Sequence, residues 1–375
     1  MGRLNTNPLR PITEPFWAGT RSPARSVGSV TLRSYSLRDR VQNPLILISA
    51  FVLITVLIQS YCPIQAQQVA EGQTAEARSG HYRFFTLDVV PQTRGLTVAW
   101  GFNNERTVVG EFDLDFATHG FIYSHGEYTA LDVPADGAIN TELFGINNRG
   151  EIVGVYQKPG TGGAISGLVS VAFVYDHGAF REISHPDAPC GIFPRGINDA
   201  EAMAGYYFDV DCNSHGFLRE HGNFFSLDVP DSVVGITRVY GLNNRAEVIG
   251  TYVGFDDAAH GFIYSGGSYT TLDHPVGANG GTVALAINNL SNVAGYYFDA
   301  TDNFTFHGFV YSRGRWETVD VPDANAGTEI FGINDHGDLT GLYGRNVPAP
   351  PDHCKVPPCF DLEIHGFLAT RIPRD

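Results

Sequence analysis

Five histidines recur at one position of a repeated line of the type "HGF", and histidine commonly ligates metals or transfers protons. They are His119, His215, His260, His307 and His365. An aspartate recurs in the neighbouring line of the type "LDVP", at Asp88, Asp132, Asp228, Asp273 and Asp320. A metal site needs ligands that converge on one point, whereas equivalent positions of separate repeats lie apart. The sequence therefore predicts that each histidine bonds within its own repeat.

A second repeated line, of the type "GINNRGEIVGVY", is preceded by a position that varies. Two residues before its isoleucine position stand Trp100, Phe144, Arg195, Tyr240, Leu285 and Phe331. Two residues further up, three members are charged, namely Glu142, Arg238 and Glu329. Aromatic rings beside charged groups suit a sugar or a peptide, because rings stack on apolar faces and charged groups bind polar ones. We expect a neutral or cationic ligand centred on Trp100, Arg195 and Tyr240; the alternative is that the rings only fill a narrow channel.

One acidic segment has the spacing of a calcium loop. In "DVDCNSHGFLRE", Asp209, Asp211 and Asn213 occupy loop positions 1, 3 and 5. Ser214 stands where the sharp turn of a helix-loop-helix site needs glycine, so that type of site is not expected. A looser structural Ca²⁺ site at this loop stays open, and no other cofactor is expected.

Catalytic motifs are absent from the sequence. It contains no zinc-spaced histidine cluster, nucleophile elbow or phosphate-binding loop. Carboxylate pairs could in principle act as acid and base, as they do in glycosidases. The sequence therefore favours a non-catalytic binding or scaffold protein for a glycan, peptide or cell-surface partner. An extracellular carbohydrate-active hydrolase or lyase is the alternative.

The N-terminal 66 residues have the pattern of an export signal. Seven arginines precede an apolar run at 45–58, and small Ala66 follows. This order is that of a secretory signal, and an uncleaved signal anchor is the alternative. We expect a secreted protein, extracellular or periplasmic, with a linker at 67–80 and one domain at 81–375.

The remaining chain is strongly acidic. The whole sequence has 24 basic and 40 acidic residues, and 7 and 2 of these lie in 1–66, which leaves 17 and 38, a net charge of −21. Such a surface repels phosphate groups, so nucleic acid and anionic membranes are not expected partners. We expect a monomer.

Four cysteines follow the signal, an even number for an oxidising compartment. Cys190 and Cys212 fall in two connections that we expect on the same face, and Cys354 and Cys359 share one long loop. The sequence therefore predicts the disulfides 190–212 and 354–359.

The elements that must position these residues repeat six times. The "GIN"-type line starts at 101, 145, 196, 241, 286 and 332, a spacing of 44 to 51 residues. This period is typical of a propeller blade of four strands. The last repeat ends soon after its third strand, "IHGFLA" at 364–369, while "YRFFTLDVV" at 82–90 is a fourth strand with nothing before it. The sequence predicts an all-β, six-bladed β-propeller whose ring is closed by the N-terminal strand.

The two ends of such a ring differ in their connections. The turns between first and second strands are short and nearly uniform, so we expect little function there. The connections between second and third strands vary and include 158–170 and 346–363. We call the end that carries them the loop face and expect the partner to bind there. One glycine recurs in every second strand, for example Gly110 and Gly154, and predicts crowding between blades.

The two lines "GINNRGEIVGVY" and "HGFIYSHGEYTALDVP" resemble the bacterial extracellular repeat named HAF after its His-Ala-Phe core. The resemblance covers about 82 to 370. This chain has His-Gly-Phe at the corresponding positions. Only "VAFVYD" at 171–176 has the alanine, and it lacks the histidine. The resemblance implies secretion and a repeat architecture, and it implies no catalytic residues.

Overall fold

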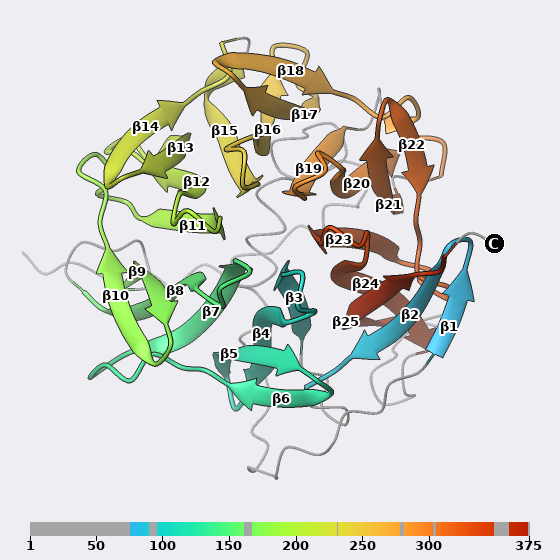
Figure 1. Cartoon of the computed structure of the whole chain (residues 1–375), viewed down its shortest axis with the longest axis horizontal. Coiled ribbons are helices and arrows are strands. Elements are labelled where there is room, and N and C mark those ends of the chain that lie inside the picture. The colour runs from blue at the N-terminus through green and yellow to red at the C-terminus, as the bar shows by residue number, and fades with distance from the viewer. Residues whose placement is uncertain are drawn as a thin grey trace, which may run out of the picture. The chain divides into compact units, whose positions relative to one another are not determined.

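The computed structural model of the chain describes residues 76–89, 96–160, 167–230, 232–277, 281–302, 305–348 and 360–373. These residues contain strands and no α-helix. The predicted signal (1–66) and the pair Cys354 and Cys359 lie outside the described residues. The strands form twisted sheets placed around a common centre (Figure 1). The prediction of an all-β chain built from four-stranded sheets is confirmed.

Each sheet has an inner strand next to the centre, followed by a second strand in chain order. The inner strands are β3 (Thr97–Phe102), β7 (Ile139–Ile146), β11 (Ile192–Ile197), β15 (Ser232–Leu242), β19 (Thr282–Ile287) and β23 (Gly327–Ile333). The second strands are β4 (Val108–Leu114), β8 (Ile152–Pro159), β12 (Met203–Phe208), β16 (Val248–Gly254), β20 (Val293–Asp299) and β24 (Leu339–Pro348).

The third and outer strands complete the sheets, and all strand pairs are antiparallel except one. The third strands are β5 (Ala117–Ser124), β9 (Leu168–Asp176), β13 (Ser214–Glu220), β17 (Ala259–Ser265), β21 (Thr305–Ser312) and β25 (Phe360–Arg371). The outer strands are β6 (Glu127–Ala130), β10 (Ala179–Ile183), β14 (Asn223–Leu227), β18 (Ser268–Leu272) and β22 (Arg315–Thr318). A single parallel bridge between Ser214 and Ile236 joins the β11–β14 and β15–β18 strands.

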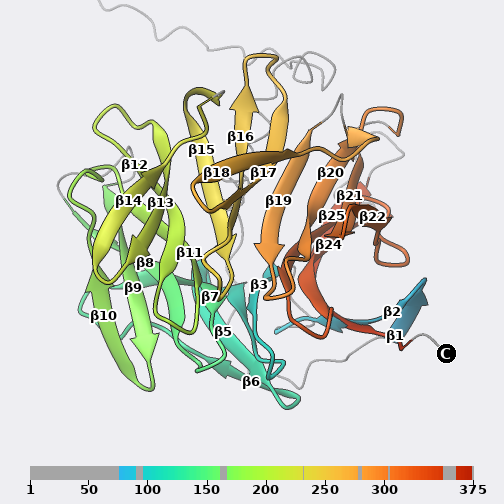
Figure 2. The ribbon, with the colours of Figure 1, turned by 45° about the horizontal axis from the view of Figure 1, so that its top comes forward.

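The two ends of the described chain share one sheet. The strand β2 (Tyr82–Leu87) pairs antiparallel with β25 over six positions, so this sheet runs β1-β2-β25-β24-β23 (Figures 1 and 2). Its fifth strand, β1 (Glu76–Ser79), lies inside the segment 67–80 that the sequence predicts as a linker. The prediction missed it because its signal is short: Gly80, at a positive φ of 54°, permits a tight turn into β2.

Every inner strand has a β-bulge at the same place. The pairing register with the second strand shifts across one residue in each sheet. The skipped residues are Trp100, Phe144, Arg195, Tyr240, Leu285 and Phe331. A bulge re-aims its side chain, so the fold turns these six variable residues away from the ladder. We call them the bulge layer.

The bulge also explains the repeated glycine of the second strand. A Cβ at Gly110 would lie 2.0 Å from the carbonyl oxygen of Val98, which belongs to the same sheet. The other five glycines meet the equivalent carbonyl at 1.9–2.2 Å. The predicted crowding between blades is therefore wrong for this position, because the close contact lies within each sheet. Crowding between sheets occurs instead at Gly101, whose Cβ would lie 2.7 Å from the carbonyl oxygen of Phe144.

Candidate functional site

The bulge layer converges on the central axis. The rings of Trp100 and Phe331 stack at 4.3 Å, and Phe144 meets Trp100 edge-on at 5.9 Å. The guanidinium of Arg195 lies 3.8 Å from the ring centre of Phe144 and 6.0 Å from that of Tyr240. These residues come from five different inner strands, so the structure brings the predicted aromatic and cationic group together. Because the rings pack on one another, the layer forms a floor across the axis.

A polar layer lies above this floor, toward the loop face. Each inner strand runs from the loop face to its turn with the second strand, so Glu142, Arg238 and Glu329 precede the bulge residues of their strands. Glu329 is 2% exposed, and Glu142 and Arg238 are half-buried. The side chains of Glu111, Tyr206 and Tyr296 join them from the neighbouring second strands.

Sequence reasoning missed Glu111, Tyr206 and Tyr296. All three directly follow the repeated glycine of the second strand, at a position occupied in the six repeats by Glu, Val, Tyr, Thr, Tyr and Leu. Variation at this one place in otherwise similar lines is the signal that could have found them.

Glu111, which is 2% exposed, and the half-buried Glu142 form an acidic pair. Burial raises the pKa of Glu142 to about 7, although Arg195 opposes the shift. Burial and then the charge of Glu142 raise the pKa of Glu111 well above its ordinary value. Two like charges in a low-dielectric site favour retention of a proton. The pair can therefore donate and accept hydrogen bonds at neutral pH.

Two arginines, Arg195 of the bulge layer and Arg238 of the polar layer, bring positive charge to the same region of the axis. Arg195 donates a hydrogen bond from Nη2 to the Tyr206 hydroxyl at 3.2 Å, and the Arg238 guanidinium lies 5.3 Å from the same ring. Burial raises the pKa of Glu329 to about 8. The layer thus combines hydrogen-bond donors and acceptors of both charge types.

Several polar atoms of the two layers have no hydrogen-bond partner in the described part of the chain. They are Arg195 Nε and Nη1, Arg238 Nε and Glu329 Oε1, whereas the Trp100 indole N–H donates a hydrogen bond to the Glu111 carboxyl, which lowers the pKa of Glu111. Native proteins rarely leave buried polar atoms unpaired, because each costs about 1–3 kcal/mol. Their concentration on one axis marks this region as the candidate site for polar partners.

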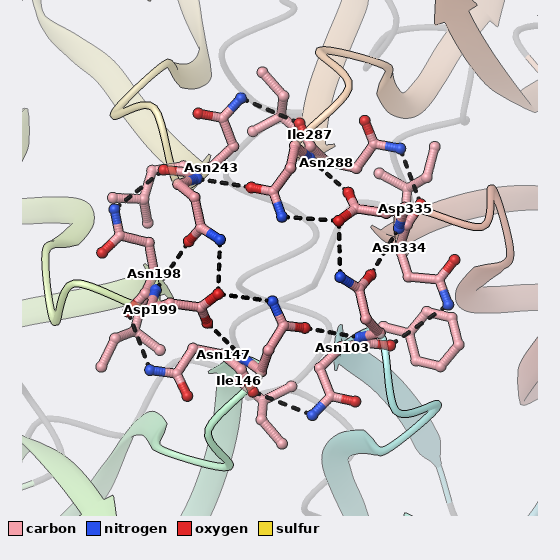
Figure 3. A pocket seen from close by; sticks show the side chains of 18 residues that line it. Asn103, Ile146, Asn147, Asn198, Asp199, Asn243, Ile287, Asn288, Asn334 and Asp335 are labelled. Atoms are coloured by element: carbon pink, nitrogen blue, oxygen red, sulfur yellow. Dashed lines mark hydrogen bonds between the residues drawn. The ribbon is translucent and has the colours of Figure 1, made fainter.

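The other end of the axis contains a cavity of about 70 Å³ (Figure 3). Three consecutive residues from the end of each inner strand line it, namely 102–104, 146–148, 197–199, 242–244, 287–289 and 333–335. The middle residue is asparagine in every case. Each Nδ2 donates to the carbonyl oxygen of the next asparagine in the series Asn103, Asn147, Asn198, Asn243, Asn288 and Asn334, and the last donates back to Asn103, at 2.9–3.5 Å.

The third residues form a rim with two acidic members, Asp199 and Asp335. Asp199 Oδ2 accepts hydrogen bonds from the amides of Asn148 and Asn244, at 2.9 and 2.6 Å. Asp335 Oδ2 likewise accepts hydrogen bonds from the amides of Asn104 and Asn289, at 2.7 and 2.9 Å. Burial raises the pKa of Asp199, but these hydrogen bonds outweigh it and hold the pKa below its usual value. The sequence predicted little function at this end, and the structure shows that its uniform turns lock neighbouring sheets together.

The repeated histidines bond within their own sheets. Nδ1 lies 2.8–3.1 Å from the repeated aspartate in all five cases, including His365 of β25 with Asp88 at the end of β2. His260 also contacts Asp256 through Nε2, at 3.1 Å. Each histidine is therefore an ordered bridge between strands.

We predict that His260 makes stability depend on pH. Its bonds to Asp273 and then Asp256 raise the pKa of His260 to about 9, against the effect of burial. Because the pKa of His260 is higher in the folded state than in the unfolded state, its protonation stabilises the fold. This stabilisation is fully present at a pH below the unfolded-state pKa of about 6.5, and it is lost as the pH rises through the folded-state pKa of about 9. Urea unfolding should show His260→Gln less stable than the parent at pH 6, with a smaller difference at pH 10. A difference that does not change with pH would contradict this assignment.

The acidic loop with calcium spacing is organised around one carboxylate. Asp209 Oδ1 accepts the backbone N–H groups of Asp211 and Asn213, both at 2.9 Å, and Oδ2 lies 3.2 Å from His215. Within the described ranges no group of three or more His, Cys, Asp or Glu side chains is placed to hold a metal ion. Calcium at Asp209, Asp211 and Asn213 stays a prediction.

Cys190 and Cys212 lie side by side at the loop face, with sulfur atoms 2.8 Å apart. Both are exposed. We predict that they form a disulfide under oxidising conditions, since the backbone already brings them together. Peptide mapping without reduction should recover the joined 190 and 212 peptides. Alkylation of both thiols in protein that has never been reduced would refute the bond.

No protein-family model and no curated protein matches the chain. Among solved structures, AofleA from Arthrobotrys oligospora is similar with a TM-score of 0.42 and 11% identity, over 73% of this chain and 89% of that one. The Aleuria aurantia lectin (a point mutant) in complex with Fucα1-6GlcNAc is similar with a TM-score of 0.40 and 8% identity, over 71% of this chain and 94% of the lectin. XC5397 from Xanthomonas campestris, a gluconolactonase, is similar with a TM-score of 0.44 and 11% identity, over 83% of this chain and 100% of that one. Likenesses this weak support no functional argument. In the described part of the chain, no helix is long and apolar enough to cross a membrane.

Proposed function

We propose that the chain is a secreted, non-catalytic six-bladed β-propeller of the HAF repeat type, closed into a ring by β2. It binds a neutral or cationic saccharide or peptide group on its axis, from the loop face. Secretion rests on the order of basic, apolar and small residues in 1–66.

Six blades and closure are supported by the repeated details. Six inner strands carry the same bulge, and the asparagine series returns from Asn334 to Asn103. The pairing of β2 with β25 provides the last sheet with the outer strand that its own repeat lacks. Closure of this kind leaves no long strand edge exposed.

The observation that carries the binding function is the set of unpartnered polar atoms above the aromatic floor. A ligand with hydroxyl, amide or ammonium groups can pair with the unpartnered atoms of Arg238 and Glu329 beside the acidic pair Glu111 and Glu142. The raised pKa of both members lets the acidic pair bond either donors or acceptors, while a polyanion would meet the net charge of −21. Trp100 offers the ligand no free stacking face, because its ring already packs on Phe331.

A glycan and peptide array probed with the secreted protein tests this function, with and without EDTA. We expect neutral or cationic ligands to bind, and Glu111→Gln to weaken binding at least tenfold, since it removes the proton-sharing carboxyl. Glu105→Gln, in an exposed turn at the other end of the axis, is the matched control. EDTA sensitivity would support calcium at the Asp209 loop. A protein that binds nothing on the array, or only polyanions, would refute the proposal.

The acidic pair also favours a second candidate, a carbohydrate-active hydrolase or lyase. Two neighbouring carboxyls with raised pKa are suited to general acid and base roles. This candidate predicts turnover of a bound glycan that Glu111→Gln abolishes. Binding without product formation over hours would exclude it.

A further inference from the structure

Two second strands carry the same six residues. The segment "AGYYFD" stands at 204–209, in and just after β12, and again at 294–299, in β20. In each copy the ring of the first tyrosine meets the phenylalanine ring edge-on, at 5.7 Å and 84° in β12 and at 5.5 Å and 75° in β20. We call these rings the β12 pair, Tyr206 and Phe208, and the β20 pair, Tyr296 and Phe298. The fold thus contains one aromatic arrangement twice, in different surroundings.

The β12 pair is covered by cations of the chain itself. The Arg238 guanidinium lies 5.3 Å from the ring centre of Tyr206 and 5.9 Å from that of Phe208. The Arg195 guanidinium lies 5.6 Å from the Tyr206 ring and donates a hydrogen bond to its hydroxyl. Guanidinium groups are attracted to aromatic faces at such distances. Beneath these cations Tyr206 is only 3% exposed.

The β20 pair lacks the counterparts of both cations. In the repeat, Glu329 takes the place of Arg238, directly after a threonine in each case, and Leu285 takes the place of Arg195. Burial and then the Glu329 carboxyl raise the pKa of Tyr296 well above its ordinary value, so these two side chains are neighbours. Tyr296 remains half-buried. The ring that an arginine covers in one copy therefore stands beside a carboxyl in the other.

The Glu329 carboxyl is incompletely paired. Glu329 is 2% exposed, and its Oε1 has no hydrogen-bond partner in the described part of the chain. A glutamate side chain is two atoms shorter than an arginine side chain up to its charged carbon, so Glu329 cannot fill the volume that the Arg238 guanidinium occupies in the other copy. Burial raises the pKa of Glu329 to about 8, and a cation beside it would favour the ionised form.

We propose that Glu329, Tyr296 and Phe298 form a binding site for an ammonium or guanidinium group of a ligand. The group takes the place that Arg238 has on the β12 pair, with its charge on the Glu329 carboxylate and its flank on the rings. Because the carboxylate is removed from water, this attraction is stronger than at an exposed site. The proposal rests on the axial binding function and adds a ligand class to it, an organic cation such as an amino sugar or a basic amino-acid side chain.

The carboxylate has a second task at this site. The charge of Arg238 reaches Tyr296 and lowers its pKa, against the effects of burial and Glu329. The same charge repels a second cation, and the Glu329 carboxylate offsets that repulsion. Binding of a cation should therefore depend on the charge of Glu329 more than on the rings.

Isothermal titration at pH 8, close to the raised pKa of Glu329, tests the proposal with two matched pairs of probes. One pair is the β-1,4 dimer of glucosamine and its N,N′-diacetylated form, and the other is Nα-acetyl-lysine amide and its Nε-acetylated form. We expect the cationic member of at least one pair to bind at least tenfold more tightly than its acetylated partner. The pair that shows this preference identifies the source of the cation. No preference in either pair, or no binding of any probe, would overturn the proposal.

Variants at the site separate the cation contact from other effects of the probes. Glu329→Gln keeps the shape of the side chain without its charge, so the affinity for the cationic probe should fall at least tenfold, while that for its acetylated partner changes less than twofold. Glu329→Arg supplies a guanidinium from within the chain, as Arg238 does, and should also prevent binding of the cation. Tyr296→Leu should weaken that binding at least threefold through the loss of a ring face.

Glu105→Gln, in an exposed turn at the other end of the axis, is the matched control and should change affinity less than twofold. Urea unfolding shows whether each variant is folded before it is titrated. Cation binding that survives in folded Glu329→Gln and Glu329→Arg proteins would overturn the proposal. Array ligands that depend on Glu111 but show no preference for a cation would refute the cation site and leave the axial binding function standing.

Discussion

A chain that starts at Gly95 is expected to aggregate or to melt far below the parent protein. It lacks β2, whose six paired positions cover the edge of β25. It also loses four buried apolar side chains, Tyr82, Phe84, Leu87 and Val89. At about 2 kcal/mol each, they account for much of a typical net stability of ~5–15 kcal/mol. The exposed edge of β25 would then be free to pair with another molecule.

Light scattering and thermal unfolding measure this effect, with a chain that starts at Gln67 as the control. Adding a synthetic peptide of residues 76–94 should restore part of the lost stability, because the strand can pair from outside the chain. A truncated chain that melts like the control would show that β2 does not complete the sheet.

Gly110→Ala should be among the most damaging single substitutions in the fold. The new Cβ would lie 2.0 Å from the Val98 carbonyl oxygen. Backbone cannot yield as a flexible side chain would, so the bulge itself must move. We expect a loss of roughly 3 kcal/mol or more, the range of severe packing defects.

Gly241→Ala is the matched control, because its nearest contact is an ordinary 3.4 Å and the next repeat already has Ala286 at this place. Urea denaturation of both variants gives the comparison. Similar small losses in the two proteins would mean that the bulge is not rigid.

Repetition made the strands predictable from sequence. Because six copies had to satisfy one pattern, the turns and alternation in any copy could be checked against the others. The position two residues before the isoleucine position of each repeat also identified Trp100, Arg195 and Tyr240, which the structure brings to the axis. The bulge that turns them there could not be predicted, since a register shift of one residue depends on the pairing partner and leaves no mark in one strand alone.

The remaining misses concern contacts between repeats. Glu111 meets Glu142 only because a second strand faces the inner strand of the next sheet. The asparagine-lined cavity was passed over because uniform turns were interpreted as functionless, although uniformity is what a bond from each repeat to the next requires. β1 was missed because a four-residue strand beside a glycine has too little pattern to detect.

Glu329→Met gives the most direct test of the claim that the axial polar atoms are retained for a ligand. Glu329 is 2% exposed, and its Oε1 has no partner in the described part of the chain. If the carboxyl serves only binding, an apolar side chain of similar volume should leave stability unchanged or raise it by about 1–2 kcal/mol. The Kd of a ligand found on the array should rise at least tenfold in the same protein. A clear fall in stability together with an unchanged Kd would show that the polar layer only fills the axis.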